Sequence, residues 1–523
     1  MKSAMRALLW SAGALVFVLL VVLIWVLTLF DPTDFRGPIA REIETRTGYR
    51  FALEGPISFD PRYESPGRLF ADITVQDAHL REIAGVPGAQ RLHLKTLEWS
   101  VELGDLLGAV RGTSFAGRGH FKMADADLRG MLGAREINWD VFTPSAFRAA
   151  SASGSFELDS EALSLTGLQL SLNATQIRGE LEVEQWSGSP VFDFDLTIPS
   201  LDLGDFVQRE NQQPFDTLVV LNLPAVLAAQ SQASGTLRIG SLHSAGVVLS
   251  DVVMPLHAHS GRVSASPITA GFYGGTARVD TLLQVNGADL SFQTRQEVRQ
   301  CQIGNLLGDL GLTEMIEAQG NFSATLAFSG VDAVSRMASA RGVIRVAAQE
   351  GRVKGVNLGT WIERLGRNTL GDGSEWAGES TFTSLGDIDA TLRVEQGLVI
   401  NEDLAFQAGG LDVRGHGGLA LESGAIDYRI SLTLDKPEIA AMLPPPFNSG
   451  VMVLPLRISG RWDMPSLMID IPQMLQFQLQ AAVGGSSELA KVPVDEYANS
   501  LERDLQGELS QALQDFASEP ATQ

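Results

Sequence analysis

Beyond residue 30, the strongest pattern in the chain is an alternation of apolar and polar residues with a period of two. In residues 191–198, for example, Phe and Leu side chains alternate with Asp193, Asp195 and Thr197. Successive side chains of a β-strand point to opposite faces, so the pattern predicts strands with one apolar and one solvated face, as in antiparallel sheets. The clearest apolar positions are Leu168, Leu170, Leu172, Phe192, Phe194, Leu196 and Ile198.

Similar short strands recur about every 8–12 residues, with Gly, Asn, Asp or Ser between them, which is typical of a long meander. Three segments have helical spacing instead. Residues 35–43 and 358–365 predict short helices, and residues 497–516 predict an acidic amphipathic helix at the C-terminus. The sequence therefore predicts a mainly β protein with a few helices.

The first thirty residues differ from the rest. Residues 7–30 carry no charge and are mostly Leu, Val, Ile, Phe and Trp, and a bilayer core of about 30 Å needs roughly 20 such residues. No small-residue cleavage site follows, so we expect an uncleaved transmembrane helix. Lys2 and Arg6 precede it, which predicts a single-pass protein with a cytoplasmic N-terminus and its bulk across the membrane.

The composition argues against some classes of partner and bond. The chain has 39 Lys and Arg against 62 Asp and Glu, a net charge of −23, which disfavours nucleic acid as a partner. Residues 1–30 carry +2, so the remainder carries −25. Cys301 is the single cysteine and can form no intramolecular disulfide.

No motif points to catalysis, a cofactor or a metal. The acidic residues alternate with apolar ones, as expected for solvated strand faces, and no nucleotide-binding, hydrolase or zinc signature occurs. His257 and His259 are interpreted as surface strand residues. The Gly-rich stretch at residues 415–418 is interpreted as turn geometry between two strands. We expect a protein that is not an enzyme and has no cofactor.

A set of short elements in a fixed order resembles the AsmA family of Gram-negative bacteria. The family's "TGR" opening, Asn-Trp pair, "YGG" turn, "T.F..L" element and "G.G.idL" strand each have a counterpart, whereas residues 146–230 carry no recognised element. The matching residues are Thr47 and Gly48; Asn138 and Trp139; Tyr273, Gly274 and Gly275; Thr381 and Phe382; and Gly415 and Gly417.

The resemblance implies a bacterial inner-membrane protein with a β-rich body in the periplasm, a role in outer-membrane biogenesis and no established catalytic residues. The wider superfamily resembles bridge-like lipid-transfer proteins. That likeness implies an elongated sheet curled into an open groove, in which the seven apolar residues above would contact phospholipid or another acyl lipid. Alternation alone cannot separate this groove from apolar faces packed in closed sandwiches or barrels.

An alternative function is a scaffold or modulator of outer-membrane protein assembly that acts through protein partners. The C-terminal helix either binds such a partner or packs on the β body. We expect five regions: 1–30, cytoplasmic N-terminus and anchor; 31–145, N-terminal AsmA-like β region; 146–230, middle β region; 231–470, AsmA-like C-terminal β region; 471–523, linker and helical tail.

Overall fold

The computed structural model divides into two compact units. Unit 1 comprises residues 1–134, 147–172 and 184–188, and unit 2 comprises the remainder. The boundaries of these units differ from those of the five regions predicted from the sequence, and the five regions stay a prediction. The structure describes residues 49–53, 55–65, 68–82, 91–102, 117–126, 142–159, 162–185, 190–206, 232–244, 246–286, 289–310, 314–331, 333–366, 377–434, 452–461, 464–470 and 495–518.

Unit 1 is an antiparallel sheet. The long strand β3 pairs with β1 along its C-terminal part and with β2 along its N-terminal part, and each strand from β3 to β6 then pairs with the next. Alternate β3 side chains Ala71, Ile73 and Val75 are buried. The strands are β1 (Tyr49–Leu53), β2 (Ile57–Ser65), β3 (Arg68–Glu82), β4 (Arg91–Glu102), β5 (Gly117–Ala126), β6 (Ala150–Leu158) and β7 (Ala162–Leu172).

Unit 2 is a longer ladder in which nearly every strand pairs antiparallel with the next. Two pairings break the rule: β9 and β10 run parallel, and β16 pairs with both β17 and β18. The strands are β8 (Thr175–Glu184), β9 (Val191–Asp202), β10 (Gln232–Ser244), β11 (Val247–His259), β12 (Arg262–Phe272), β13 (Gly275–Asn286), β14 (Asp289–Gln302), β15 (Ile316–Gly330), β16 (Arg341–Val356), β17 (Ala377–Ser384), β18 (Ile388–Glu395), β19 (Leu398–Ala408), β20 (Leu411–Ala420), β21 (Ala425–Leu434), β22 (Met452–Arg461) and β23 (Met464–Ile469).

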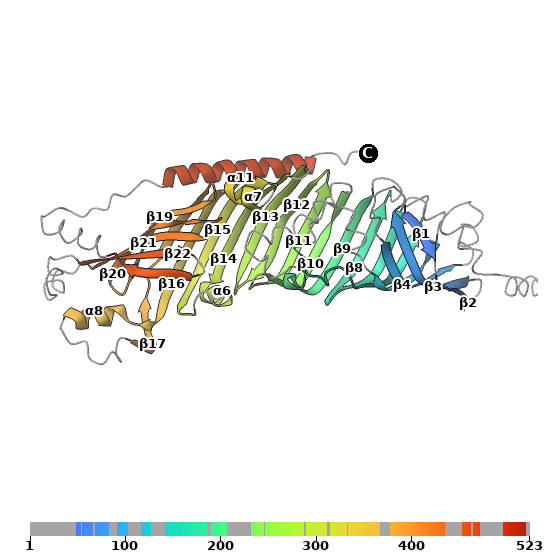
Figure 1. Ribbon diagram of the computed structural model, residues 1–523, viewed down its shortest axis with the longest axis horizontal. Coiled ribbons are helices and arrows are strands. Elements are labelled where there is room, and N and C mark those ends of the chain that lie inside the picture. Colours follow the sequence, from blue (N-terminus) through green and yellow to red (C-terminus); the bar gives the residue numbers. More distant parts are fainter. Residues whose placement is uncertain are drawn as a thin grey trace, which may run out of the picture. The chain divides into compact units, whose positions relative to one another are not determined.

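Few helices accompany the described strands. The short helices are η3 (Leu203–Asp205), α6 (Ile303–Asp309), α7 (Ala333–Ser339) and α8 (Leu358–Gly366), and the C-terminal helix is α11 (Asp495–Ser518). Figure 1 shows α11 lying across several strands of unit 2, and it contacts β13, β14, β15 and β16. The predictions of helices at 358–365 and 497–516 are confirmed, whereas α6 and α7 were not predicted.

The sheet is not curled, so the prediction of a curled sheet was wrong. Alternation determines which side chains share a face, but the bend of a sheet around that face depends on bulges and register. The mainly β, antiparallel-rich class is confirmed.

The predicted membrane anchor at residues 7–30 and the predicted helix at residues 35–43 lie outside the described residues. Among the described residues, no helix is long and apolar enough to span a bilayer.

Candidate functional site

The four apolar residues that the sequence singled out on β9 share one face of the sheet. The parallel register places Phe192, Phe194, Leu196 and Ile198 beside Ala233, Gly235, Leu237 and Ile239 of β10. Neighbouring strands in register point equivalent side chains to the same side, so the two rows form one apolar surface. The Cβ of any larger residue at position 235 would lie 2.1 Å from the Phe194 carbonyl oxygen, so glycine permits this close approach.

The same surface continues strand by strand to the end of the ladder. From β9 to β23, the strand registers place Leu, Ile, Val and Phe side chains on one side of the sheet at most positions. We call this side the apolar face. Representative members beyond β10 are Val252, Leu256, Val263, Phe272, Leu283, Phe292, Val298, Phe322, Leu326, Ile344, Leu392, Val399, Val413, Ile430, Leu432, Leu456 and Ile458.

Many of the large side chains on the apolar face remain partly exposed. Phe292, Phe322, Ile344 and Ile430 are all half-buried, although the Phe292 ring stacks on Phe328 with centroids 5.0 Å apart. A core between two packed sheets would exclude water from such residues. An apolar ligand that covered this partly exposed surface would gain about 25 cal/mol for each Å² of apolar area that it removes from water.

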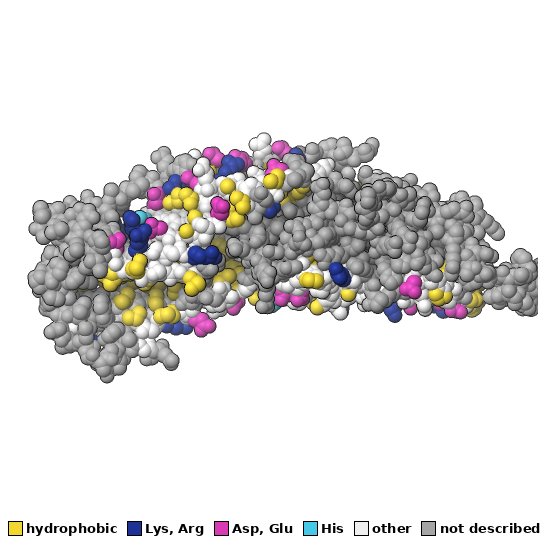
Figure 2. Space-filling model, in the orientation of Figure 1, with side chains coloured by type: hydrophobic (Ala, Val, Ile, Leu, Met, Phe, Trp, Pro, Cys, Tyr) yellow, Lys and Arg dark blue, Asp and Glu magenta, His cyan; other side chains and the backbone are white. Residues whose placement is uncertain are grey.

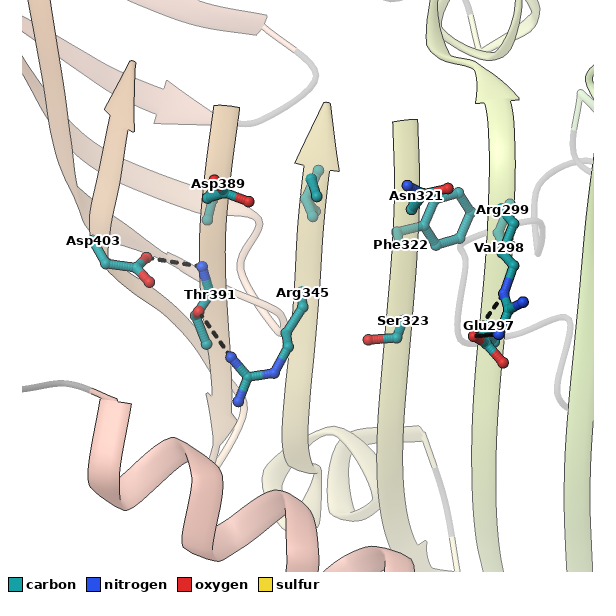
Figure 3. Close-up of a pocket in the computed structure, with 13 residues that line it drawn as sticks. Glu297, Val298, Arg299, Asn321, Phe322, Ser323, Arg345, Asp389, Thr391 and Asp403 are labelled. Carbon is teal, nitrogen blue, oxygen red and sulfur yellow. Dashed lines mark hydrogen bonds and ion pairs between the residues drawn. The ribbon is translucent and has the colours of Figure 1, made fainter. Parts of the chain in front are cut away.

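The opposite side of the same strands, which we call the polar face, is charged. It carries Arg295, Glu297 and Arg299 on β14, and Arg341 and Arg345 on β16. A depression of about 760 Å³ lies on this face in unit 2 (Figure 3). Its polar lining comprises Glu297, Arg299, Asn321, Ser323, Arg345, Asp389, Thr391 and Asp403. The rest of the lining is Val298, Phe322, Val346, Ala347 and Ala390. The charges of both signs in the depression can bind water and polar groups.

Helix α11 is held on the polar face by hydrogen bonds from Arg345 and by two buried leucines. The guanidinium of Arg345 donates to Glu502 at 2.8 Å and to Asn499 at 2.7 Å. Leu505 and Leu509 are 4% and 3% exposed, and Leu509 packs on β13. Of the two roles weighed for the tail, packing on the β body is therefore what the structure shows, and binding of a protein partner stays a prediction.

A buried polar network interrupts the apolar face at a bulge in β19. The bulge between Asn401 and Leu404 displaces the ladder, and Asn401 donates to the Thr391 carbonyl at 3.0 Å and to Asp403 at 2.8 Å. The Thr391 amide donates to Asp403 at 2.8 Å, and Figure 3 shows this bond together with the one from Arg345 to Thr391. The network satisfies backbone groups that the bulge leaves unpaired.

Tyr428 completes this network from the next strand but one. Its hydroxyl donates to the Asn401 side chain, and its ring covers Gly415 and Gly417, where a Cβ would approach the ring to 2.8 and 2.9 Å. Burial, and then the charge of Asp403, raise the pKa of Tyr428. The interpretation of residues 415–418 as a turn was wrong: they lie inside β20, because the tyrosine ring occupies the space that larger side chains would fill.

The other three residues predicted to contact lipid lie in unit 1. Leu168, Leu170 and Leu172 lie on β7 of unit 1, where Leu170 and Leu172 are in register with Ala152 and Ala150. The structure thus assigns these leucines and the β9 residues to different units. Their contact with lipid stays a prediction.

The resemblance motifs are also separated in the fold. Tyr273 and Gly274 form the tight turn between β12 and β13, with φ of 44° and 78°, a left-handed conformation that glycine adopts readily. Burial, and then a hydrogen bond to Asp309, raise the pKa of Tyr273 to about 12. Gly275 begins β13, and Thr381 and Phe382 lie on β17. The motif residues outside the described part of the chain are Thr47, Gly48, Asn138 and Trp139.

Comparison with known proteins decides the family. The model of the AsmA family matches residues 141–404. The chain belongs to the AsmA family. The match includes residues 146–230, where sequence inspection found no family element, and it ends before the motif residues of β20.

One curated AsmA-family relative is similar over a long stretch. Protein AsmA of Escherichia coli (strain K12) is 21% identical over 342 residues, which cover 61% of this chain and 54% of that protein. The match thus spans about half the length of the relative. No solved structure matches this chain significantly.

Proposed function

We propose that this protein is a non-catalytic factor of the bacterial envelope that binds phospholipid on its apolar face and passes it between the inner and outer membranes. The family assignment supports a role in outer-membrane biogenesis or lipid transport. The single observation that carries the lipid-binding proposal is the row of Leu, Ile, Val and Phe residues, many of them partly exposed, that continues across the strands of unit 2.

The free energy of binding an acyl chain to this face is favourable but modest. Burying a CH₂ group contributes about 0.8 kcal/mol, so a chain of about 16 carbons with half its surface covered gains about 6 kcal/mol. Ordering the chain opposes part of this gain. Because the contacts are apolar and repeat from strand to strand, a chain can exchange one set for the next without breaking an ion pair.

The polar side of the sheet fits the same proposal. Charged residues such as Arg295 and Glu297 keep that side solvated, so acyl chains would be confined to one side of a single layer. In this proposal the head groups remain in water beside the strands, and the protein is anchored in the inner membrane with its bulk in the periplasm.

Photo-crosslinking tests the proposal with controls on the same strands. We would place a photoreactive amino acid at Phe194 or Ile430 on the apolar face, and at the nearby Asp195 or Thr433 on the polar face, which lie outside any basic cluster. Expressed as the full chain in bacteria, the first pair should yield phospholipid adducts by mass spectrometry. The polar-face pair should yield several-fold fewer.

Equal yields on both faces, or none at Phe194 and Ile430, would contradict lipid binding by the apolar face. A second arm addresses the alternative role in protein assembly. In that role, deletion of residues 484–523 would remove the cellular phenotype while the lipid adducts persist.

A further inference from the structure

A row of cationic side chains crosses three neighbouring strands on the polar face near the end of the sheet. Antiparallel register places His416 of β20 opposite Arg429 of β21, and Arg429 opposite Arg457 of β22. Arg414 lies two residues before His416 on the same side. Figure 2 shows cations gathered beside a histidine over the region where Figure 1 places β19–β21.

This row is unfavourable as a purely internal arrangement. Like charges directly opposite one another destabilise a sheet. Asp427 accepts two hydrogen bonds from Arg457, at 2.9 and 3.0 Å, and it is also attracted to Arg429 and His416. Among the described residues, no side chain forms a salt bridge with Arg414 or Arg429 within 4.0 Å. Strands β20–β23, together with Asp470 that follows them and attracts Arg457, contain four arginines against three aspartates, in a chain whose net charge is −23. This end of the sheet therefore carries a small local excess of positive charge, which an external anion could balance.

Exposed apolar side chains lie directly beside these cations. Met468 of β23 is opposite Arg457, and Met464 is opposite Arg461, so both methionines share the polar face. They are 53% and 81% exposed, and β23 contains no charged residue. We name the set Arg414, His416, Arg429, Arg457, Met464 and Met468 the basic surface.

We propose that the basic surface docks on the head-group layer of an anionic phospholipid membrane. Guanidinium groups bind phosphate oxygens with two parallel hydrogen bonds, and methionine side chains can enter the boundary between head groups and acyl chains. An acidic protein would neutralise the arginines, but its charged surface would leave the methionines in contact with polar groups. Phospholipid supplies both the anion and the apolar contact.

The proposal goes beyond lipid binding by the apolar face, because it concerns the opposite side of the sheet. It states which part of the molecule touches a membrane, and it holds whether or not acyl chains occupy the apolar face. Vesicle capture therefore fails or succeeds independently of the crosslinking at Phe194.

The test is capture of acceptor vesicles by the full chain reconstituted in phosphatidylcholine vesicles. Labelled acceptors of phosphatidylcholine, with or without phosphatidylglycerol, are mixed with these vesicles and separated by flotation. We expect capture only of the phosphatidylglycerol acceptors, and weaker capture as salt is raised. Each cation near an anionic surface strengthens binding about fivefold, so R429Q with R457Q should weaken capture about 30-fold.

Matched variants separate the charges from the methionines. R278Q removes an exposed cation from β13 on the same face and should leave capture unchanged. M464S with M468S keeps every arginine and should weaken capture while preserving its dependence on phosphatidylglycerol. Thermal unfolding followed by circular dichroism checks that each variant is folded.

Three results would overturn the proposal. The first is equal capture of neutral and anionic acceptors, and the second is undiminished capture by folded R429Q/R457Q. The third is a combined result: a poly-glutamate peptide displaces bound vesicles, R429Q/R457Q no longer binds that peptide, and the methionine substitutions have no effect. This result would assign the basic surface to an acidic protein partner.

Discussion

Replacing Leu509 by alanine should loosen α11 without unfolding the sheet beneath it. Leu509 is 3% exposed and packs on Leu282, which is 6% exposed. Buried Leu→Ala substitutions cost about 2–5 kcal/mol, and the lower end applies here because water can enter beside a helix on a sheet surface. A cost of about 2 kcal/mol corresponds to a change of about 30-fold in the docking equilibrium.

Hydrogen exchange of the α11 amides measures that equilibrium. The undocked helix would rest on local propensity alone, which is marginal in water, so its amides should exchange when it leaves the sheet. We expect exchange across residues 499–515 to accelerate about 30-fold in L509A. Exchange in β14 and β15 should change far less.

A substitution of opposite sign on the same helix makes the test sharper. Gly507 is exposed, and a Cβ there would meet no atom within 4 Å. G507A should therefore stabilise α11 by about 1 kcal/mol and slow its exchange about fivefold. The reasoning is refuted if L509A leaves α11 exchange unchanged, or if α11 and the strands accelerate together, because the helix would then open only with the whole unit.

Three further predictions concern single positions in unit 2. G417A should lower the free energy of unfolding by about 3 kcal/mol in urea titration, because its Cβ would lie 2.3 Å from the Asp427 carbonyl oxygen, whereas G308A should be tolerated. The hydrogen bonds from Arg457 lower the pKa of Asp427, so this pair should stabilise the fold above the carboxyl's ordinary pKa and lose its effect as pH falls through the lowered value; NMR titration of R457Q should show the pKa raised. Y273F should cost about 1 kcal/mol in the same urea assay, because the hydroxyl bonds to α6 and β11 are lost.

Much of the two-faced character of the sheet could be predicted from the sequence, because alternation is a local property. Phe194 and Asp195 must point to opposite faces in any extended strand, and the structure places them so. The same holds for the helical stripe of α11, whose buried Leu505 and Leu509 are four residues apart.

The remainder depends on which strands pair, and no local pattern determines that. The parallel pairing of β9 with β10 joins strands that are not linked by a tight turn. The row of His416, Arg429 and Arg457 exists only once three registers are fixed. Pairs of glycines two residues apart were visible in the sequence, but only the opposing Tyr428 shows that they belong to a strand.

The meander at the end of unit 2 has a consequence for how this unit can change in length. From β18 to β23, each strand pairs with the one that follows it in the chain. Inserting or deleting a whole hairpin would leave the direction and sidedness of every other strand intact. Each such event changes the span by about 10 Å, because strands lie about 4.8 Å apart. Reach is thus a property that evolution could adjust in fixed steps, without altering the chemistry of either face.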